Sequence, residues 1–367
     1  MFKRIAELIA IASRAGTFED CAFFPDRRYR AVPINQKNFL PPEVILGNFP
    51  RISFCDGGNA ELFSSPNISL QLVRGYFSVF REQQKVAFGL KSFYLLISAG
   101  EKEGSLRYSC NFFSKSGDEL SGREICGLFG VEEADSQAFF SEAGSFSFDP
   151  LEKSIMSGKE RASPSRIADI IRRYFELSIA RASLQKLEKG DFILLDGTLQ
   201  CMFPGEQYFL EKLYSDASSK GISVCALAKT SGLITKKGKP LIPLLAEISP
   251  ISEWYYHPIV EIESPEHQAE MYIIKLNSNS NYAFRFEVYR NGLYDIQKII
   301  DALQKNSRDY SFPGYPYGLI DADKFAQVTN EEKSSLRAML FSESGMLFPK
   351  LRSIASSTDA HDILNRI

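Results

Sequence analysis

The chain has 367 residues, which is long enough for two structural units or for one elaborated α/β domain. Its content of 44% hydrophobic and 24% charged residues is ordinary for a globular protein and excludes collagen-like and disordered classes. The 43 basic residues are balanced by 45 acidic residues, and this net charge of −2 does not indicate a nucleic-acid binder, so any site for a polyanion has to be local.

Cysteine usage and apolar runs indicate the compartment. The six cysteines form no CxxC pair and have no metal-ligand spacing, which favours free thiols in a reducing compartment. Residues 1–16 carry charges among their apolar positions and do not resemble a signal peptide. No run of about 18 apolar residues occurs, so we expect no membrane span and a cytoplasmic location.

The first half of the chain predicts a helix, a strand and a β-meander. Residues 2–13 place apolar side chains at helical spacing, typical of an amphipathic helix that packs on the body or on a partner. After a proline-rich connection, the apolar strand ISFC is expected to end at Asp56-Gly57-Gly58. Residues 68–113 are rich in β-branched and aromatic residues and predict three or four meandering strands. Residues 115–160 are polar and are typical of an insertion or a mobile element.

The second half alternates helices with apolar strands. The clearest helix begins after Ser163-Pro164-Ser165 and is expected to run to about Lys189, with the buried strand FILLD directly after it. Its basic residues Arg172, Arg173 and Arg181 are expected on a solvated face. The later elements are a helix at 205–219, a strand at 222–228, a loop at 229–239, a hairpin over 269–289, a helix at 294–305 and a helical region at 319–342. This order predicts a mixed α/β sheet with helices packed on it.

Two apolar strands are followed by the same dipeptide, Asp-Gly, at Asp56 and at Asp196. Asp-Gly is first of all a turn signal. A carboxylate at the end of a strand also projects from the edge of the sheet where α/β proteins usually bind ligands. Two such carboxylates on one edge would build a site for Mg²⁺ or Mn²⁺, because these cations prefer oxygen ligands. The three histidines do not cluster, which disfavours a zinc site.

Glu176 is the candidate third carboxylate. It lies on the helix that leads into the second Asp strand, twenty residues before Asp196. Its helical angle places it at the edge of the apolar stripe rather than on the outer face. The competing interpretation is a solvated glutamate on the flank of the helix.

Five segments in this order resemble the NurA family of prokaryotic nucleases that process DNA ends: CDGG, RRYFELSIARASLQKLEKGDFILLDGTL, ALAKTSG, FRFEVY and GYPYGLIDADKFA. The likeness covers about residues 50–330, and the glutamate helix followed by the LLDGTL strand is its most specific part. The resemblance implies an RNase H-like mixed sheet with flanking helices, elaborated by a β-meander or barrel-like portion. One nuclease domain would then span 1–367, with an N-terminal helix and linker at 1–49, the first Asp strand and meander at 50–114, a variable insertion at 115–160, the remaining core at 161–345 and a tail at 346–367.

The resemblance also implies a catalytic set. Its metal ligands match Asp56, Glu176, Asp196 and Asp323. Asp323 stands where the family usually has histidine, and a carboxylate there can also bind a metal while adding a negative charge; Asp321 is the alternative for this position. The loop lysine of the family matches Lys229, and the tyrosine of its GYP segment matches Tyr315, which could instead be a core residue.

The activity implied by this likeness is hydrolysis of DNA phosphodiester bonds with two Mn²⁺ or Mg²⁺ ions. The enzyme would be an exonuclease, with possible endonuclease activity, that acts on DNA ends or single strands in end resection and repair. Its partners would be a second copy of the chain in a homodimer and a HerA-type hexameric ATPase.

DNA contacts are expected from one loop and one strand: Lys229, Lys236, Lys237, Lys239 and Arg285. The lysines could equally form a solvated hairpin tip, and Arg285 could pair with Glu287. Two other functions stay open: a phosphotransferase of the actin-like or sugar-kinase type, although the chain has no P-loop, and a catalytically silent DNA clamp.

Overall fold

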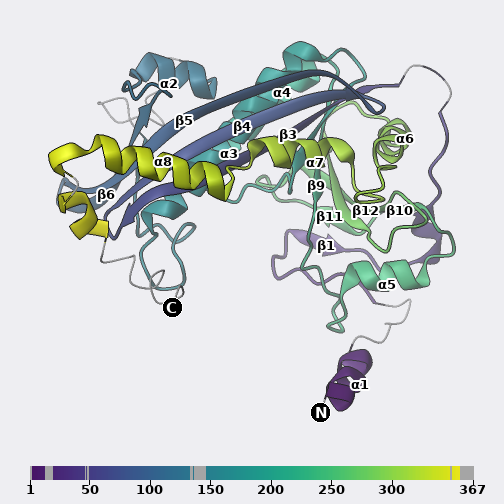
Figure 1. The fold of residues 1–367 in the computed structure, drawn as a ribbon. Coiled ribbons are helices and arrows are strands. Elements are labelled where there is room, and N and C mark those ends of the chain that lie inside the picture. Colours follow the sequence, from purple (N-terminus) through teal and green to yellow (C-terminus); the bar gives the residue numbers. More distant parts are fainter. Residues whose placement is uncertain are drawn as a thin grey trace.

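The computed structural model describes residues 2–12, 20–45, 47, 49–132, 135, 146–347 and 349–355. Within these ranges one mixed sheet has 11 strands, and helices lie on both of its faces (Figure 1). The predicted α/β class is therefore confirmed. In spatial order the strands are β2 (Phe39–Leu40), β10 (Trp254–Tyr256), β12 (Ala269–Lys275), β13 (Phe284–Tyr289), β9 (Ser223–Ala228), β8 (Phe192–Asp196), β3 (Arg51–Ser65), β4 (Ile68–Arg81), β5 (Gln84–Lys102), β6 (Ser105–Phe113) and β7 (Ser147–Phe148).

The remaining elements surround this sheet. A separate two-stranded ribbon pairs β1 (Tyr29–Ala31) with β11 (Val260–Ile262). The helices of the described ranges are α1 (Phe2–Ala12), α2 (Gly122–Phe129), α3 (Pro164–Ser183), α4 (Glu206–Ser219), α5 (Leu241–Ile248), α6 (Ile296–Asn306), α7 (Tyr317–Ala326) and α8 (Asn330–Glu343). None of these helices has the length and apolar character needed to cross a membrane.

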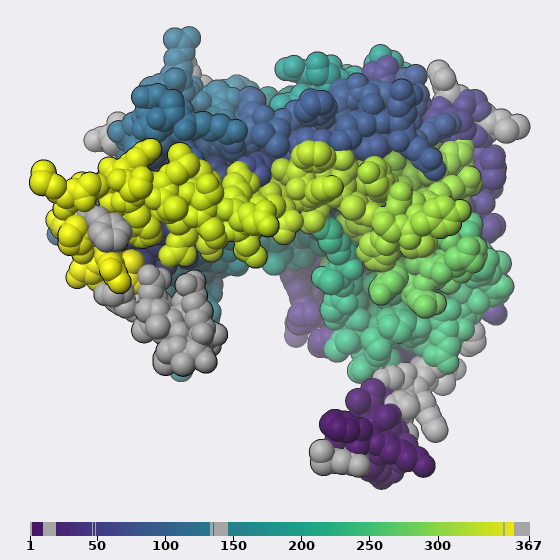
Figure 2. Space-filling view, viewed as in Figure 1, coloured from purple at the N-terminus to yellow at the C-terminus, as the bar shows by residue number. Residues whose placement is uncertain are grey.

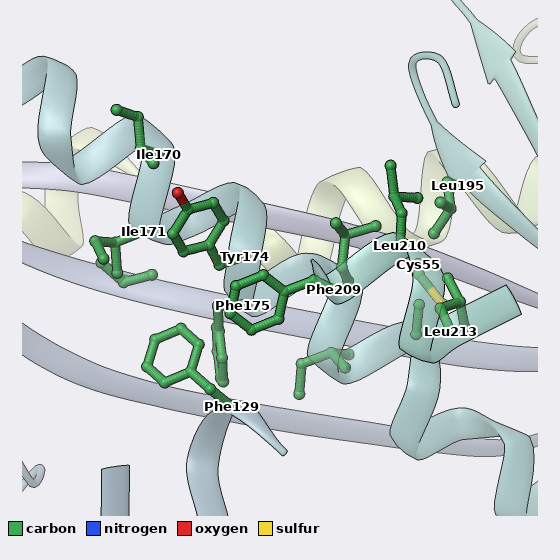
Figure 3. Close-up of a cluster of buried hydrophobic side chains, with 14 of the residues drawn as sticks. Cys55, Phe129, Ile170, Ile171, Tyr174, Phe175, Leu195, Phe209, Leu210 and Leu213 are labelled. Atoms are coloured by element: carbon green, nitrogen blue, oxygen red, sulfur yellow. The ribbon is translucent and has the colours of Figure 1, made fainter. Parts of the chain in front are cut away.

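The sheet separates two cores because side chains alternate between the faces of a strand. Cys55 of β3 and Leu195 of β8 pack with α3 and α4, where Tyr174 and Phe175 meet Phe209 (Figure 3). The neighbouring even-numbered residues of β3 and β8 face the other way and pack with α6 and α7. Packing of the two cores therefore determines on which face of the sheet each side chain of β3 and β8 lies.

The strand that carries Asp56 is longer than predicted. The predicted stop at Asp56-Gly57-Gly58 is wrong, because β3 continues to Ser65 and these three residues pair with Tyr76, Gly75 and Arg74 of β4. The glycines serve close packing instead of a turn. A Cβ on Gly58 would lie 2.2 Å from the carbonyl oxygen of Ala326 in α7, and one on Gly57 would lie 3.2 Å from Cβ of Glu176 in α3.

Helix α3 begins where the sequence predicts and ends earlier. The side chain of Ser163 accepts a hydrogen bond from the backbone N–H of Arg166, and Pro164 occupies the first turn. The α-helix stops at Ser183 and a 3-10 turn follows at Leu184–Lys186, so the expected end near Lys189 is too late. Strand β8 then pairs in parallel with β3 on one side and β9 on the other.

The meander predicted over 68–113 is confirmed as the three strands β4 to β6, which continue the sheet from β3 and form an arm that α8 crosses (Figure 1). The helical region expected at 319–342 is two helices, because α7 ends at Ala326 and Thr329 caps the start of α8. Arg74 of β4 fastens this junction by donating to the carbonyl oxygen of Gln327 at 3.0 Å and pairing with Glu332 at 2.5 Å.

Parts of the predicted insertion and termini lie outside the described residues, namely 133–134, 136–145, 13–19 and 356–367. Within 115–160 the structure shows α2, closed by a capping box between Ser121 and Glu124, and the short edge strand β7. The predicted helix at the N-terminus is confirmed as α1, which stands off the body with Phe2, Leu8 and Ile9 exposed (Figure 2).

Candidate active site

Three carboxylates meet at the edge of the sheet where β3 and β8 separate. Parallel pairing between these strands ends at Cys55 and Leu195, and the next residues are Asp56 and Asp196. Asp323 reaches the same place from α7. Each of the three offers a carboxylate oxygen that lies within 4.8 Å of the other two. We call Asp56, Asp196 and Asp323 the carboxylate cluster.

Strand alternation explains why these carboxylates share one face. Asp56 pairs with Tyr76 of β4, and Asp196 pairs with Leu227 of β9. Tyr76 and Leu227 both belong to the core formed with α6 and α7. Residues opposite each other in neighbouring strands point to the same side of a sheet, so both aspartates face α7 and Asp323.

Asp56 is the most perturbed acid of the cluster. It is 8% exposed, and its own carboxylate accepts the backbone N–H of Gly57 at 2.7 Å. Burial raises the pKa of Asp56 to about 8, helped by the negative charges of Glu176 and Asp196 and opposed by Lys229. A positive charge beside Asp56 would therefore favour its ionised form.

Lys229, the first residue after β9, supplies such a charge. Its Nζ lies 2.8 Å from Oδ2 of Asp196 and 2.7 Å from Oδ1 of Asp323. Burial alone would lower the pKa of Lys229, but these two carboxylates hold that pKa well above its usual range. An ammonium held between two carboxylates shows that the cluster fits a cation, and its all-oxygen donor set suits Mn²⁺ or Mg²⁺.

Tyr315 is a core residue, which was one of the two interpretations of it from the sequence. Its ring is buried and stacks on Phe312, with centroids 5.1 Å apart, so it is a core residue. Its hydroxyl has no hydrogen-bond partner among the described residues. Burial raises the pKa of Tyr315, and the nearby charges of the carboxylate cluster raise it further. A contact of this buried hydroxyl with a phosphate stays a prediction.

Asp321 pairs with side chains outside the carboxylate cluster. Its carboxylate accepts a hydrogen bond from the Tyr76 hydroxyl at 3.1 Å and pairs with Lys85 at 2.6 Å. The structure thus brings Asp323 rather than Asp321 to the carboxylate cluster, as the alignment of the motif predicts.

Glu176 lies beside the cluster but outside it. It is 2% exposed, so the interpretation as a solvated helix residue is wrong. It reaches the site from α3, on the opposite face of the sheet, and both of its oxygens are engaged: Oε1 by Arg173 at 2.7 Å and Oε2 by Arg172 at 3.2 Å. Burial raises the pKa of Glu176, opposed by these two arginines. Its role as a metal ligand stays a prediction.

The predicted DNA contacts occupy two different places. Lys236 and Lys237 are exposed on the loop after β9, and Lys239 on the same loop is half-buried. The backbone N–H of Lys236 donates to the carbonyl oxygen of Cys21 at 2.9 Å. Arg285 lies on the α3 and α4 side of β13, where Nη2 is 2.5 Å from Oε1 of Glu287. The structure does not bring Arg285 to the carboxylate cluster, and contacts of all four residues with DNA stay predictions.

The basic residues next to Glu176 were not predicted as part of the site. Arg173, expected on a solvated face, is 8% exposed and Arg172 is half-buried. Their spacing was the available signal, because residues three and four positions before Glu176 share its side of a helix. Burial of that side is a tertiary property that the helix pattern alone did not show.

No protein-family model matches the chain, and no curated protein matches it in sequence. Among solved structures, the chain is similar to the NurA nuclease from Sulfolobus solfataricus, with 12% identity, a TM-score of 0.51 and coverage of 94% of each chain. It is also similar to Ciona intestinalis Endonuclease V in complex with a 24mer DNA containing an inosine followed by a ribo-adenosine, with 10% identity, a TM-score of 0.36 and coverage of 92% of this chain and 99% of that one. A third similar structure is human ENDOV, with 11% identity, a TM-score of 0.37 and coverage of 82% and 94%.

These findings concern the fold. The likeness to the NurA nuclease extends over nearly all of both chains, so the chain has a NurA-like nuclease fold. This confirms the predicted resemblance at the level of the fold, and the sheet topology confirms the predicted mixed sheet with flanking helices.

Proposed function

We propose that this protein is a metal-dependent nuclease that hydrolyses DNA phosphodiester bonds. The carboxylate cluster is the observation that supports it most: three acids from β3, β8 and α7 offer oxygens within 4.8 Å of one another. The likeness of the fold to a NurA nuclease structure, over 94% of each chain, supports it independently.

The chemistry of the cluster suits phosphoryl transfer. Two divalent ions, when bound, activate the attacking water and neutralise the charge that develops on the phosphate and the leaving oxygen. Asp56, Asp196 and Asp323 would hold them. Lys229, displaced from the carboxylates, would pair with a non-bridging phosphate oxygen as a point charge. The hydroxyl of Tyr315 would donate to the same phosphate.

The finer assignments rest on the family resemblance. They are Mn²⁺ as the preferred ion, DNA ends or single strands as substrate, exonuclease activity with endonuclease activity beside it, a homodimer, a HerA-type ATPase as partner and a cytoplasmic location. The exposed lysines of the loop after β9 are proposed to follow the DNA backbone, because they extend from the same loop that delivers Lys229 to the cluster.

The phosphotransferase alternative loses one of its two supports in the structure. That interpretation placed nucleotide phosphates at turns formed by Asp56-Gly57-Gly58 and Asp196-Gly197-Thr198. The first of these segments is instead part of β3 and pairs with β4, so its backbone is engaged in the sheet. A DNA cleavage assay distinguishes an active nuclease from a catalytically silent DNA clamp.

The test is cleavage of end-labelled single- and double-stranded DNA by the full chain with Mn²⁺, Mg²⁺ or EDTA, with and without a HerA-type ATPase. We expect cleavage with Mn²⁺ and none with EDTA. Binding of DNA without cleavage under every one of these conditions would identify a silent clamp. Turnover of ATP by the chain alone, without DNA, would restore the phosphotransferase.

A further inference from the structure

We infer that Arg173 is the positioning residue of this site: it joins Glu176, the loop after Asp196 and the start of α4 into one rigid unit. The inference rests on the proposed function, because it concerns how the carboxylates of that site are held. Arg173 does not belong to the carboxylate cluster and would not touch the substrate. It would act through Glu176 and through the loop that carries Asp196.

The guanidinium of Arg173 uses its nitrogens on three separate elements. Nη1 donates to Oε1 of Glu176 at 2.7 Å, Nε donates to Oε1 of Glu206 at 2.7 Å, and Nη2 donates to the carbonyl oxygen of Thr198 at 2.9 Å. Glu176 belongs to α3, Glu206 begins α4, and Thr198 lies two residues after Asp196. A single side chain thereby fixes the distance between Glu176 and the Asp196 loop.

Glu206 completes the loop from the other end. It is 0% exposed, and its second oxygen accepts the backbone N–H groups of Met202 at 2.7 Å and Phe203 at 3.1 Å. The backbone N–H of Leu199 donates to Oε2 of Glu287 at 2.7 Å. The loop 197–205 is therefore held by buried charged groups along its length, although it contains no helix or strand of its own.

Arg172 extends the same arrangement to the first strand. Its Nη1 donates to Oε2 of Glu176 at 3.2 Å and to the carbonyl oxygen of Gly57 at 3.0 Å, directly after Asp56. Glu176 is thus held between two arginines, one of which contacts the Asp56 strand and the other the Asp196 loop. Through this pair the separation of β3 and β8, where the cluster forms, is set by side chains of α3.

Arginine suits this position better than lysine. Its planar group carries several donors in a fixed geometry, whereas lysine presents one point charge on a flexible stem. Removing Arg173 would leave Glu176 and Glu206 buried without their shared counter-charge, which is strongly unfavourable. A purely structural role would produce the same loss of stability, so the test needs a measurement that stability alone does not change.

The experiment compares Arg173→Lys, Arg173→Met and Glu206→Gln with a matched control, Arg181→Met. Arg181 lies on the same helix and also joins α3 to α4, through Asp216 at 2.5 Å, but it contacts no residue of the site. For each full-length variant we would measure the thermal midpoint, the Kd for Mn²⁺ without DNA by electron paramagnetic resonance, and kcat and KM on end-labelled DNA.

We expect Arg173→Met to weaken Mn²⁺ binding by about 10–100-fold, the usual effect of removing a residue that orients metal ligands. Arg173→Met should also lower kcat with little change in KM. Arg173→Lys and Glu206→Gln should lose less Mn²⁺ affinity and less kcat than Arg173→Met. Arg181→Met should lose stability but keep its Mn²⁺ affinity. If Arg173→Met does not fold, Arg173→Lys and Glu206→Gln carry the comparison.

Two outcomes would overturn the inference. The first is that the Arg173 and Glu206 variants bind Mn²⁺ with the Kd of wild type. The second is that Arg181→Met has the same thermal midpoint as these variants and loses as much Mn²⁺ affinity as they do. Failure of the proposed function is distinguishable, because it would appear as a wild-type protein that binds Mn²⁺ but cleaves no DNA. The metal-binding comparison would then still decide the role of Arg173.

Discussion

The ammonium of Lys229 lies 2.7 Å from Oδ1 of Asp323, although 94 residues separate them in the sequence. The same ammonium also contacts Asp196, so one lysine balances two of the three acids in the carboxylate cluster. A metal ion bound by these acids would compete with Lys229 for the same oxygens. Under the proposed function, this competition would release Lys229 to pair with the phosphate.

Replacing Lys229 with methionine should tighten Mn²⁺ binding to the DNA-free protein by about fivefold, because a partly exposed ion pair contributes up to about 1 kcal/mol. The same change should slow DNA cleavage, since a charge for the phosphate is lost. Titration calorimetry and cleavage of end-labelled DNA measure the two effects. The control is Lys298→Met, which removes an exposed lysine that pairs with Asp295 on the surface. Weaker Mn²⁺ binding in Lys229→Met would contradict the competition.

Metal affinity should depend on pH through Asp56. Burial and the charges of Glu176 and Asp196 raise the pKa of Asp56 to about 8, and a metal binds its ionised form. Mn²⁺ affinity should therefore rise about tenfold per pH unit up to about pH 8 and then level off. Measurements of Kd between pH 6 and 9 would show this, and Asp56→Asn should remove the dependence. An unchanged slope in Asp56→Asn would assign the proton to another group.

The same pKa predicts how stability changes with pH in EDTA. The folded protein holds the Asp56 proton more tightly than the unfolded chain, whose aspartate has an ordinary pKa near 3.8. The contribution of Asp56 to the free energy of unfolding is therefore fully present below that value and is lost as pH rises to about 8. Thermal midpoints in EDTA should fall less steeply over this range in Asp56→Asn than in wild type.

Asp323→His should keep metal-dependent cleavage within about tenfold of wild type, because an imidazole can take the place of the carboxylate as a metal ligand. Asp321→Asn, two residues away on α7, should lower the thermal midpoint by weakening the contacts with Lys85 and Tyr76 but keep the Mn²⁺ affinity. Cleavage assays and Mn²⁺ titrations of both proteins provide the measurement. If Asp323→His folds but is inactive, and Asp321→Asn does not bind Mn²⁺, then Asp321 and not Asp323 is the metal ligand from α7.

Tyr315→Phe should separate the core role of the ring from the role of the hydroxyl. The ring keeps its stacking on Phe312, and the hydroxyl makes no hydrogen bond within the described residues, so the thermal midpoint should be unchanged or slightly higher. The cleavage rate should fall by about 10–100-fold, as expected for a lost hydrogen bond to a charged group. A rate equal to that of wild type would leave Tyr315 as a core residue only.

The sequence predicted those elements whose signals are local. Periodicity and capping located α3, and the apolar runs located β8 and β9, because these patterns depend on neighbours in the chain. Asp56-Gly57-Gly58 was misassigned as a turn because the same glycines permit close approach of α3 and α7, which only the tertiary fold requires. Chain order alone likewise could not show that α7, which begins two residues after Tyr315, brings Asp323 to Asp56 and Asp196.

The candidate metal ligands were likewise predicted in part. The Asp-Gly pattern pointed to Asp56 and Asp196 and the family resemblance added Asp323, and the three carboxylates meet in the structure. Glu176 was correctly placed off the solvated face, but its two arginine partners were not foreseen, since their burial depends on how α3 packs against α4 and the loop after Asp196.

The most direct test of the central claim uses Asp196→Ala. We would measure Mn²⁺-dependent cleavage of end-labelled DNA together with the Kd for the same DNA. The account predicts that cleavage is abolished and that DNA binding is retained or tightened, because the change removes a metal ligand and also a negative charge that repels the phosphate. Cleavage at the wild-type rate, or a loss of DNA binding equal to the loss of cleavage, would contradict the assignment of the carboxylate cluster as the catalytic site.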